Sequence, residues 1–557
     1  MTTRQPLAIE VKPVEKGSAS YETTRAAILT ELASKIPKEC LLPQEIIANP
    51  PLDVTDIPRT CGILSQHELD ITEKYDAVAL VQATSTGTLS AVDVATAFCK
   101  RAAIAHQLSC CLTDYFVEEA LERAKYLDEY LKTHGRPVGP LHGCPISVKE
   151  HLPLKGHYSS WGFLVTRSFS EEDSLMVRIL RDAGAIFYVK TNQPQAIMHL
   201  ECTGFHGRTL NPSNISLSSG GSSGGEAALV ALRGSVLGIG TDIGGSIRGP
   251  AGFCGIYGFK ATAYTLPCKD FIPGGFAAEL NVLASTGPMA SSLRDAELFV
   301  NVIKAGKPHL EDPRVLPFPW TGFDTKIDLP LKIGIMTHDG QIVPQPPVLQ
   351  ALKWAEQQLS GVTNVTTKPF MPYKAATAMS SIRKAYWPDS GLPDIRACEA
   401  TGEPWHPLSD WIIKDVKGER ERTGSEVNEL RFARDTYRSE FAMDWNRQDV
   451  DFVLCPVFVG PASAHDTAFY WNYTALFNYV DYPGVVFPTP VRAGKEKEEY
   501  PAEFSTPLGP EDEHVRQMWR ESNFENAPIN LQLVARKHHD NELFGALAIL
   551  KDALKLQ

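Results

Sequence analysis

Two glycine-rich turns each present a serine in a setting that suits acyl-transfer chemistry. Ser246 ends the stretch TDIGGS, and Ser222 lies between the glycine pairs of GGSSGG. The glycines before Ser246 allow successive backbone N–H groups to point at one spot, which is what a developing oxyanion requires. A serine hydroxyl at the end of such a turn is well placed to attack a carbonyl. The same pattern also fits a tight turn with a capping serine, which needs no chemistry.

A nucleophilic serine needs a proton acceptor, and the sequence offers a lysine for this role. No serine lies in the G-x-S-x-G turn that usually accompanies a histidine base. Lys149 ends the strand-like run GCPISVK. Burial would have to lower its pKa by roughly three units from about 10.4, because only the neutral amine accepts a proton. The residue types alone therefore make Lys149 a candidate base and leave an ordinary exposed lysine as the alternative.

Three segments in this order, GCPISVKE, GGSSGGEAALVA and GTDIGGSIR, resemble the amidase signature family of hydrolases, which use a Ser–Ser–Lys triad. The resemblance implies that Lys149 is the base and Ser246 the nucleophile. It implies that Ser222, after a cis peptide bond with Gly221, is the middle serine. It further implies an oxyanion hole of backbone N–H groups, contributed by Ile243, Gly244, Gly245 and Ser246.

The implied reaction is hydrolysis of an amide C–N bond to a carboxylic acid and ammonia or an amine. Neutral Lys149 accepts a proton from Ser222, which takes one from Ser246 as Ser246 attacks the carbonyl. Water then resolves the acyl-enzyme by the same relay, and no metal or organic cofactor is required. The segment NQPQAIMHLECTG corresponds to one that lines the acyl pocket in the family, so Ile197 and Met198, with Ser222, are expected to contact substrate; ordinary core positions are the alternative for the first two.

The resemblance extends from about residue 77 to the C-terminus, and within the family it is most similar to fungal acetamidases and general amidases. Three positions depart from the family pattern: Cys144 replaces a valine or isoleucine, Glu150 replaces a common aspartate, and Ala261 replaces a proline. Acetamide-like primary amides are the leading expected substrates. Aryl amides, indole-3-acetamide, carbamates such as urethane and fatty acid amides stay open, as does a homodimer.

The elements that must position these residues follow an α/β pattern. Between about residues 137 and 305, short apolar runs bounded by glycine alternate with helix-like segments such as DSLMVRILRDAG. The fold class is therefore α/β, and the resemblance implies the amidase signature fold, a large central mixed β-sheet covered by helices on both faces. Residues 1–20 are predicted to be a loose tail, and residues 21–557 a single amidase domain with its signature core at about 137–305.

Composition limits the partners and the compartment. The net charge of −12 argues against nucleic acid, because a protein that neutralises phosphates needs a basic face. No run of 18 apolar residues predicts a membrane span, and the N-terminus lacks the apolar core of a signal peptide. The eleven cysteines are scattered rather than arranged as a disulfide framework. A small-molecule amide as partner and a cytoplasmic location are the expectation.

Four alternatives compete with this interpretation. A Cys–Glu–Lys amidase or nitrile hydrolase could use Cys144, Lys149 and Glu150, although Cys144 and Lys149 would tend to face opposite sides of a strand. A zinc hydrolase could use the histidines and cysteine of HGCPISVKEH, but the spacing matches no defensible site. A phosphate-binding module could use the glycine loops, yet no G-K-[ST] follows. The transamidating subunit of an amidotransferase is the fourth.

Overall fold

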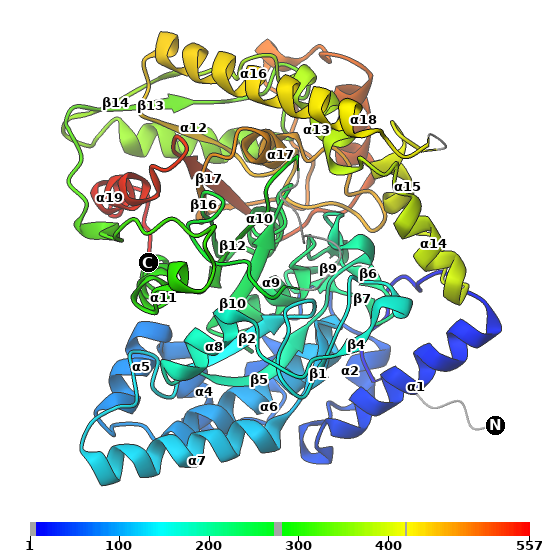
Figure 1. Cartoon of the computed structure of the whole chain (residues 1–557), viewed down its shortest axis with the longest axis vertical. Coiled ribbons are helices and arrows are strands. Elements are labelled where there is room, and N and C mark those ends of the chain that lie inside the picture. The colour runs from blue at the N-terminus through cyan, green and yellow to red at the C-terminus, as the bar shows by residue number, and fades with distance from the viewer. Residues whose placement is uncertain (1–6, 272–280, 418–419) are drawn as a thin grey trace.

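The computed structural model describes residues 7–271, 281–417 and 420–557. In this part of the chain one sheet contains eleven strands, in the order β1-β5-β2-β10-β12-β11-β16-β17-β15-β13-β14, and helices flank it (Figure 1). In that order, the strands are β1 (Leu112–Tyr115), β5 (Ile186–Thr191), β2 (Pro145–Lys149), β10 (Leu237–Asp242), β12 (Ser285–Ala290), β11 (Tyr257–Lys260), β16 (Gly484–Arg492), β17 (Pro528–Val534), β15 (Phe452–Pro456), β13 (Leu331–Ile335) and β14 (Val365–Pro369).

The sheet is mixed, as predicted. Strand β2 pairs in parallel with both β5 and β10, whereas β12 runs antiparallel to β10. The short two-stranded pairs outside it are β3 (Tyr158–Ser159) with β4 (Ser168–Phe169), β6 (Thr203–Gly204) with β7 (Gly207–Arg208), and β8 (Leu210–Asn211) with β9 (Asn214–Ser218). The strands predicted from glycine-bounded apolar runs, such as AIFYVKT and SVLGIGTD, are confirmed as β5 and β10.

The first half of the described chain contributes the α-helices α1 (Ala19–Lys35), α2 (Gln44–Ala48), α3 (Ile57–Thr60), α4 (Gln66–Lys74), α5 (Ala77–Ser85), α6 (Ala91–Ser109), α7 (Val117–His134), α8 (Leu175–Asp182), α9 (Gly224–Ala231) and α10 (Arg248–Cys254). The second half contributes α11 (Leu293–Ala305), α12 (Pro346–Leu359), α13 (Ala375–Tyr386), α14 (Leu392–Thr401), α15 (Pro407–Ile413), α16 (Gly424–Gln448), α17 (Asn472–Tyr479), α18 (Pro510–Glu521) and α19 (Asp540–Leu550).

Helix α6 begins where the sequence predicts a cap. The Ser90 hydroxyl accepts a hydrogen bond from the Asp93 N–H at 2.9 Å, which satisfies one of the donors left free at a helix start. The helix packs beside α9 and under β5, and it is buried along nearly its whole length. Apolar burial on this scale stabilises the side of the sheet that carries β2 and β10.

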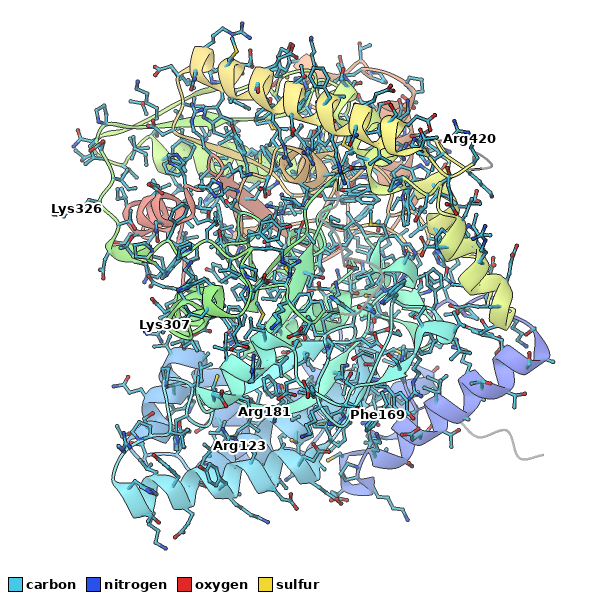
Figure 2. All side chains as sticks on the ribbon, in the orientation of Figure 1. Arg123, Phe169, Arg181, Lys307, Lys326 and Arg420 are labelled. Atoms are coloured by element: carbon cyan, nitrogen blue, oxygen red, sulfur yellow. The ribbon has the colours of Figure 1, made fainter. Side chains whose placement is uncertain are left out.

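Helices α9 and α10 lie directly on the central strands, because β10 carries glycine where they approach. A Cβ atom at Gly238 would come within 2.1 Å of the Glu226 carboxylate of α9, so only glycine leaves room for that side chain. Charged side chains are otherwise mostly peripheral: Figure 2 shows Lys307, Lys326 and Arg420 extending from the outer edge of the molecule.

The N-terminal segment differs from the loose tail predicted for residues 1–20. The Ile9 side chain is 3% exposed, and its N–H donates to the Gln107 carbonyl at 2.8 Å. Ser18 then caps α1 by accepting from the Tyr21 N–H. The buried Ile9 side chain and its backbone hydrogen bond hold this segment against α6. Residues 1–6 lie outside the described residues.

Among the helices of the described ranges, none combines the length and the apolar character that crossing a bilayer requires.

Candidate active site

Two adjacent strands bring the signature segments to one edge of the sheet. Strands β2 and β10 are parallel neighbours, with Ile146 opposite Leu237 and Val148 opposite Ile239. Parallel strands end at the same edge, so Lys149 at the end of β2 lies beside the turn that follows β10. The structure therefore brings the lysine and the second glycine-rich turn together at this edge.

Lys149 is fully buried and its amine contacts hydroxyls. The Nζ atom lies 2.7 Å from Ser222 Oγ and 3.0 Å from Thr241 Oγ1. Burial lowers the pKa of the amine from 10.5 to about 7, against smaller opposing effects of Cys202 and Asp242. A substantial fraction of the amine is therefore neutral near pH 7, which is the state that a proton acceptor needs.

Ser222 is held by the first glycine turn. The peptide bond between Gly221 and Ser222 is cis, as the family resemblance implies. A Cβ atom at Gly221 would lie 2.3 Å from the His199 carbonyl oxygen, so the turn can sit this close to the neighbouring segment only with glycine. The Ser223 N–H donates to the Ser246 carbonyl at 3.1 Å, which joins the two glycine-rich turns through their backbones.

Ser246 lines the same pocket as Ser222. No hydrogen bond joins the two hydroxyls among the residues that the structure describes, and Ser246 is 4% exposed. The predicted residues are thus brought together as a Lys149–Ser222 pair with Ser246 on the same pocket. The Ser222–Ser246 contact that a proton relay needs is not formed.

Arg248 holds the turn before Ser246 through a buried ion pair with Asp242. The Arg248 Nε and Nη2 atoms lie 3.0 and 3.1 Å from the two Asp242 carboxylate oxygens, and both side chains are inaccessible. Burial alone would raise the pKa of Asp242, but the guanidinium reverses this and lowers the pKa well below its usual range. Asp242 is therefore a fixed anion to which the turn is anchored.

The predicted oxyanion donors need one correction. The Gly245 N–H donates to Asp242 Oδ1 at 2.9 Å, so this donor is already occupied. Within the described ranges, the N–H groups of Ile243, Gly244 and Ser246 make no hydrogen bond. The turn folds back on the aspartate, and this leaves three of the four predicted groups available.

Two side chains from distant segments set the orientation of these peptide groups. The Tyr386 hydroxyl donates to the Ile243 carbonyl, and the Thr474 hydroxyl donates to the Gly244 carbonyl, each at 2.7 Å. In a trans peptide the N–H points away from the C=O. Tyr386 therefore directs the Gly244 N–H, and Thr474 directs the Gly245 N–H towards Asp242. No local sequence signal could have found either residue, because each lies over 100 positions from the turn.

The pocket combines polar and apolar side chains. It is lined by His151, Ile197, Ser222, Thr241, Asp242, Ile243, Ser246, Cys268, Phe271, Ala284, Ser285 and Thr286. Of the two predicted acyl-pocket residues, Ile197 lines it and Met198 does not. The Met198 side chain instead packs into an apolar cluster that includes Leu200 and Phe253. Positive φ angles at Ala196 and Ile197 turn the chain there, so neighbouring side chains diverge.

The alternative Cys–Glu–Lys arrangement is not assembled. Cys144 is buried, does not line the pocket, and burial raises the pKa of its thiol. Glu150 Oε2 accepts from the Ser160 N–H and from Gln193, whereas the Lys149 amine contacts Ser222 and Thr241. The described residues also contain no group of three or more histidine, cysteine, aspartate or glutamate side chains arranged to hold a metal ion.

The chain is similar in sequence to known amidases. The family model described as Amidase matches residues 93–544. A protein of Schizosaccharomyces pombe named as an amidase is 40% identical over 508 residues, covering 91% of this chain and 93% of that one. The acetamidase of Emericella nidulans is 34% identical over 555 residues, covering 96% and 98%.

Solved structures give the same picture. A fatty acid amide hydrolase superposes with a TM-score of 0.90 at 31% identity, covering 97% of each chain. A bacterial aryl acylamidase of the amidase signature family superposes with a TM-score of 0.66 at 20% identity, over 86% of this chain and 96% of that one, and supports the fold alone.

The buried ion pair gives a test of what holds the turn. We expect Asp242→Asn to lower the free energy of unfolding by about 3–5 kcal/mol, because it leaves the Arg248 guanidinium buried without its anion. The matched control is Glu513→Gln, which breaks an exposed pair with Arg520 and should cost less than about 1 kcal/mol. Urea unfolding of both variants measures the difference; equal, small losses would contradict the assignment.

Proposed function

This chain belongs to the amidase family and is an amide-hydrolysing enzyme, and we propose that it cleaves small amides through Lys149, Ser222 and Ser246. The observation that carries this proposal is the 2.7 Å contact between Lys149 Nζ and Ser222 Oγ in a pocket that Ser246 also lines. A lysine amine that is substantially neutral near pH 7 can accept a proton from a serine hydroxyl.

In the proposed first step, a rotation of the Ser246 side chain brings its hydroxyl to Ser222. The Ser246 oxygen forms a bond to the amide carbonyl carbon as its proton passes to Ser222, whose own proton passes to Lys149. The carbonyl electrons move onto oxygen, and the N–H groups of Ile243, Gly244 and Ser246 hold that charge. Gly245 is left out of this set because Asp242 occupies its N–H.

The tetrahedral adduct then collapses. Its C–N bond breaks as Ser222 gives a proton to the leaving nitrogen and regains one from the Lys149 ammonium. The amine departs, and the acyl group stays as an ester on Ser246. Water attacks that ester by the same relay, which releases the carboxylic acid and restores all three side chains. No step needs a metal or an organic cofactor.

Small primary amides are the proposed substrates. Apolar side chains from separate segments, Ile197, Phe271 and Ala284, border the pocket around the serines, which suits a short acyl group. The names of two relatives, both acetamidases, support the same class. Fatty acid amides are a second candidate, because the structure with a TM-score of 0.90 is a fatty acid amide hydrolase. Aryl amides, indole-3-acetamide and carbamates such as urethane are the remaining family substrates to compare.

We also infer a reducing, cytoplasmic location. All eleven cysteines are free in the structure, and most are buried. Unpaired thiols in this number suit a reducing compartment. A homodimer stays a prediction of the family resemblance.

Release of ammonia or amine from a panel of amides tests the function. The panel contains acetamide and longer primary amides, aryl amides, indole-3-acetamide, urethane and a fatty acid amide. We expect the highest kcat/KM with a short primary amide, and a loss of at least about 10³-fold in Ser246→Ala. Ser285→Ala, which removes another hydroxyl from the same pocket, is the matched control and should retain most activity. Turnover that survives in Ser246→Ala would refute the proposed nucleophile.

The pH dependence tests the proposed base. Because the relay needs the neutral amine and burial lowers the pKa of Lys149 to about 7, kcat/KM should rise as pH increases through about 7 and level off above it. Measurement between pH 5 and 9 with the best substrate gives the profile. A rate that is flat across this range, or that falls above pH 7, would contradict Lys149 as the base.

A further inference from the structure

The wall of the active-site pocket contains a histidine that the proposed relay does not use. His151 follows Lys149 by two residues, is 2% exposed and lines the pocket with Ser222 and Ser246. Its ring lies nearly perpendicular to that of Phe271, at an interplanar angle of 83° with the ring centroids 6.0 Å apart. What this ring can do for a substrate depends on which of its nitrogens faces the pocket and on whether that nitrogen carries a proton.

The side chain of Gln193 determines which nitrogen of His151 carries the proton. Its Nε2 atom donates to the Ser160 carbonyl at 3.0 Å and to Glu150 Oε2 at 2.8 Å. A backbone carbonyl can only accept, and Glu150 Oε2 also accepts from the Ser160 N–H, so the amide nitrogen of Gln193 must point this way. The Gln193 Oε1 atom is thereby fixed on the opposite side, 2.8 Å from His151 Nδ1.

This orientation fixes the tautomer of His151. An amide oxygen accepts only, so His151 Nδ1 must carry the proton that it donates to Gln193. The Nε2 atom of a neutral imidazole then holds a lone pair. Within the described part of the chain, Nε2 makes no hydrogen bond. This atom is also not completely buried. It opens instead on the pocket that the ring lines.

The surroundings keep this imidazole neutral. Burial lowers the pKa of His151 well below its usual value, and the Lys149 amine lowers it further; the hydrogen bond with Gln193 opposes this, and Lys190 adds a smaller lowering. A proton on Nε2 would place a buried cation beside these two lysines. His151 therefore acts as a hydrogen-bond acceptor and cannot serve as an acid near neutral pH.

We propose that His151 Nε2 accepts a hydrogen bond from the N–H of the scissile amide, and so selects amides that carry an N–H over esters and N,N-dialkyl amides. This inference rests on the proposed function, in which the leaving nitrogen must lie near Ser222 and Lys149 to receive its proton. His151 comes from the same segment as Lys149 and therefore stands on that side of the pocket. A buried acceptor left unpaired by an ester oxygen disfavours binding of the ester.

The proposal predicts a change in substrate preference when the acceptor is removed. His151→Phe keeps a planar ring in the wall and removes both nitrogens. We expect kcat/KM for the best primary amide to fall about tenfold, and kcat/KM for the methyl ester of the same acid to change by less than about twofold. His151→Asn, whose amide can donate to Gln193 and still accept from the substrate, should restore part of the amide preference.

Phe271→Leu is the matched control, because it reshapes the same part of the wall without touching a polar group and should affect both substrates alike. Thermal unfolding of each variant checks that the chain is folded. Equal losses with amide and ester in His151→Phe, or no loss with either, would overturn the proposal. Ser246→Ala separates this result from failure of the proposed function: amide and ester turnover that both persist in Ser246→Ala would refute the nucleophile, whatever His151 does.

Discussion

An amine buried without a carboxylate partner is the constraint on which the rest of this site depends. In the described residues Lys149 forms no salt bridge, and its nearest polar contacts are the hydroxyls of Ser222 and Thr241. Burial disfavours the charged amine, and its pKa falls to about 7. Chemistry that needs a neutral lysine therefore follows from where the fold puts this side chain.

The Asp242 carboxylate could stabilise a charged Lys149 amine, but it is paired with Arg248 instead. Asp242 ends the strand next to Lys149, yet Arg248 binds both of its oxygens, and the aspartate in turn holds the turn that leads to Ser246. Lys260, also buried, has a different environment: its amine donates to the carbonyls of Ala261 and Tyr482, near the Asp481 carboxylate. The Asp481 carboxylate favours the charged amine, although burial still lowers the pKa of Lys260 to about 8.

The sequence predicted the sheet and the centre of the site because their signals are local. Apolar runs bounded by glycine identify strands such as β5 and β10, and Lys149, Ser222 and Ser246 each lie in a short motif. The remaining features depend on packing between distant segments. The Gly245 N–H donates to Asp242 in a peptide group whose carbonyl is held by the distant Thr474, and Ile9 donates its N–H to the Gln107 carbonyl. The position of Met198 depends on a backbone turn that the residue types do not specify. The acceptor role of His151 requires the orientation of Gln193, which no spacing in the chain reveals.

The most direct test of the account is to find where the acyl group resides during turnover. Acid quenching of the enzyme with a good substrate in the steady state, followed by peptide mass spectrometry, identifies the acylated residue. The account predicts an adduct with the mass of the acyl group on the peptide that contains Ser246, and its absence in Ser246→Ala. An adduct on Ser222 or on Cys144 instead, in an enzyme that turns over, would contradict the central claim.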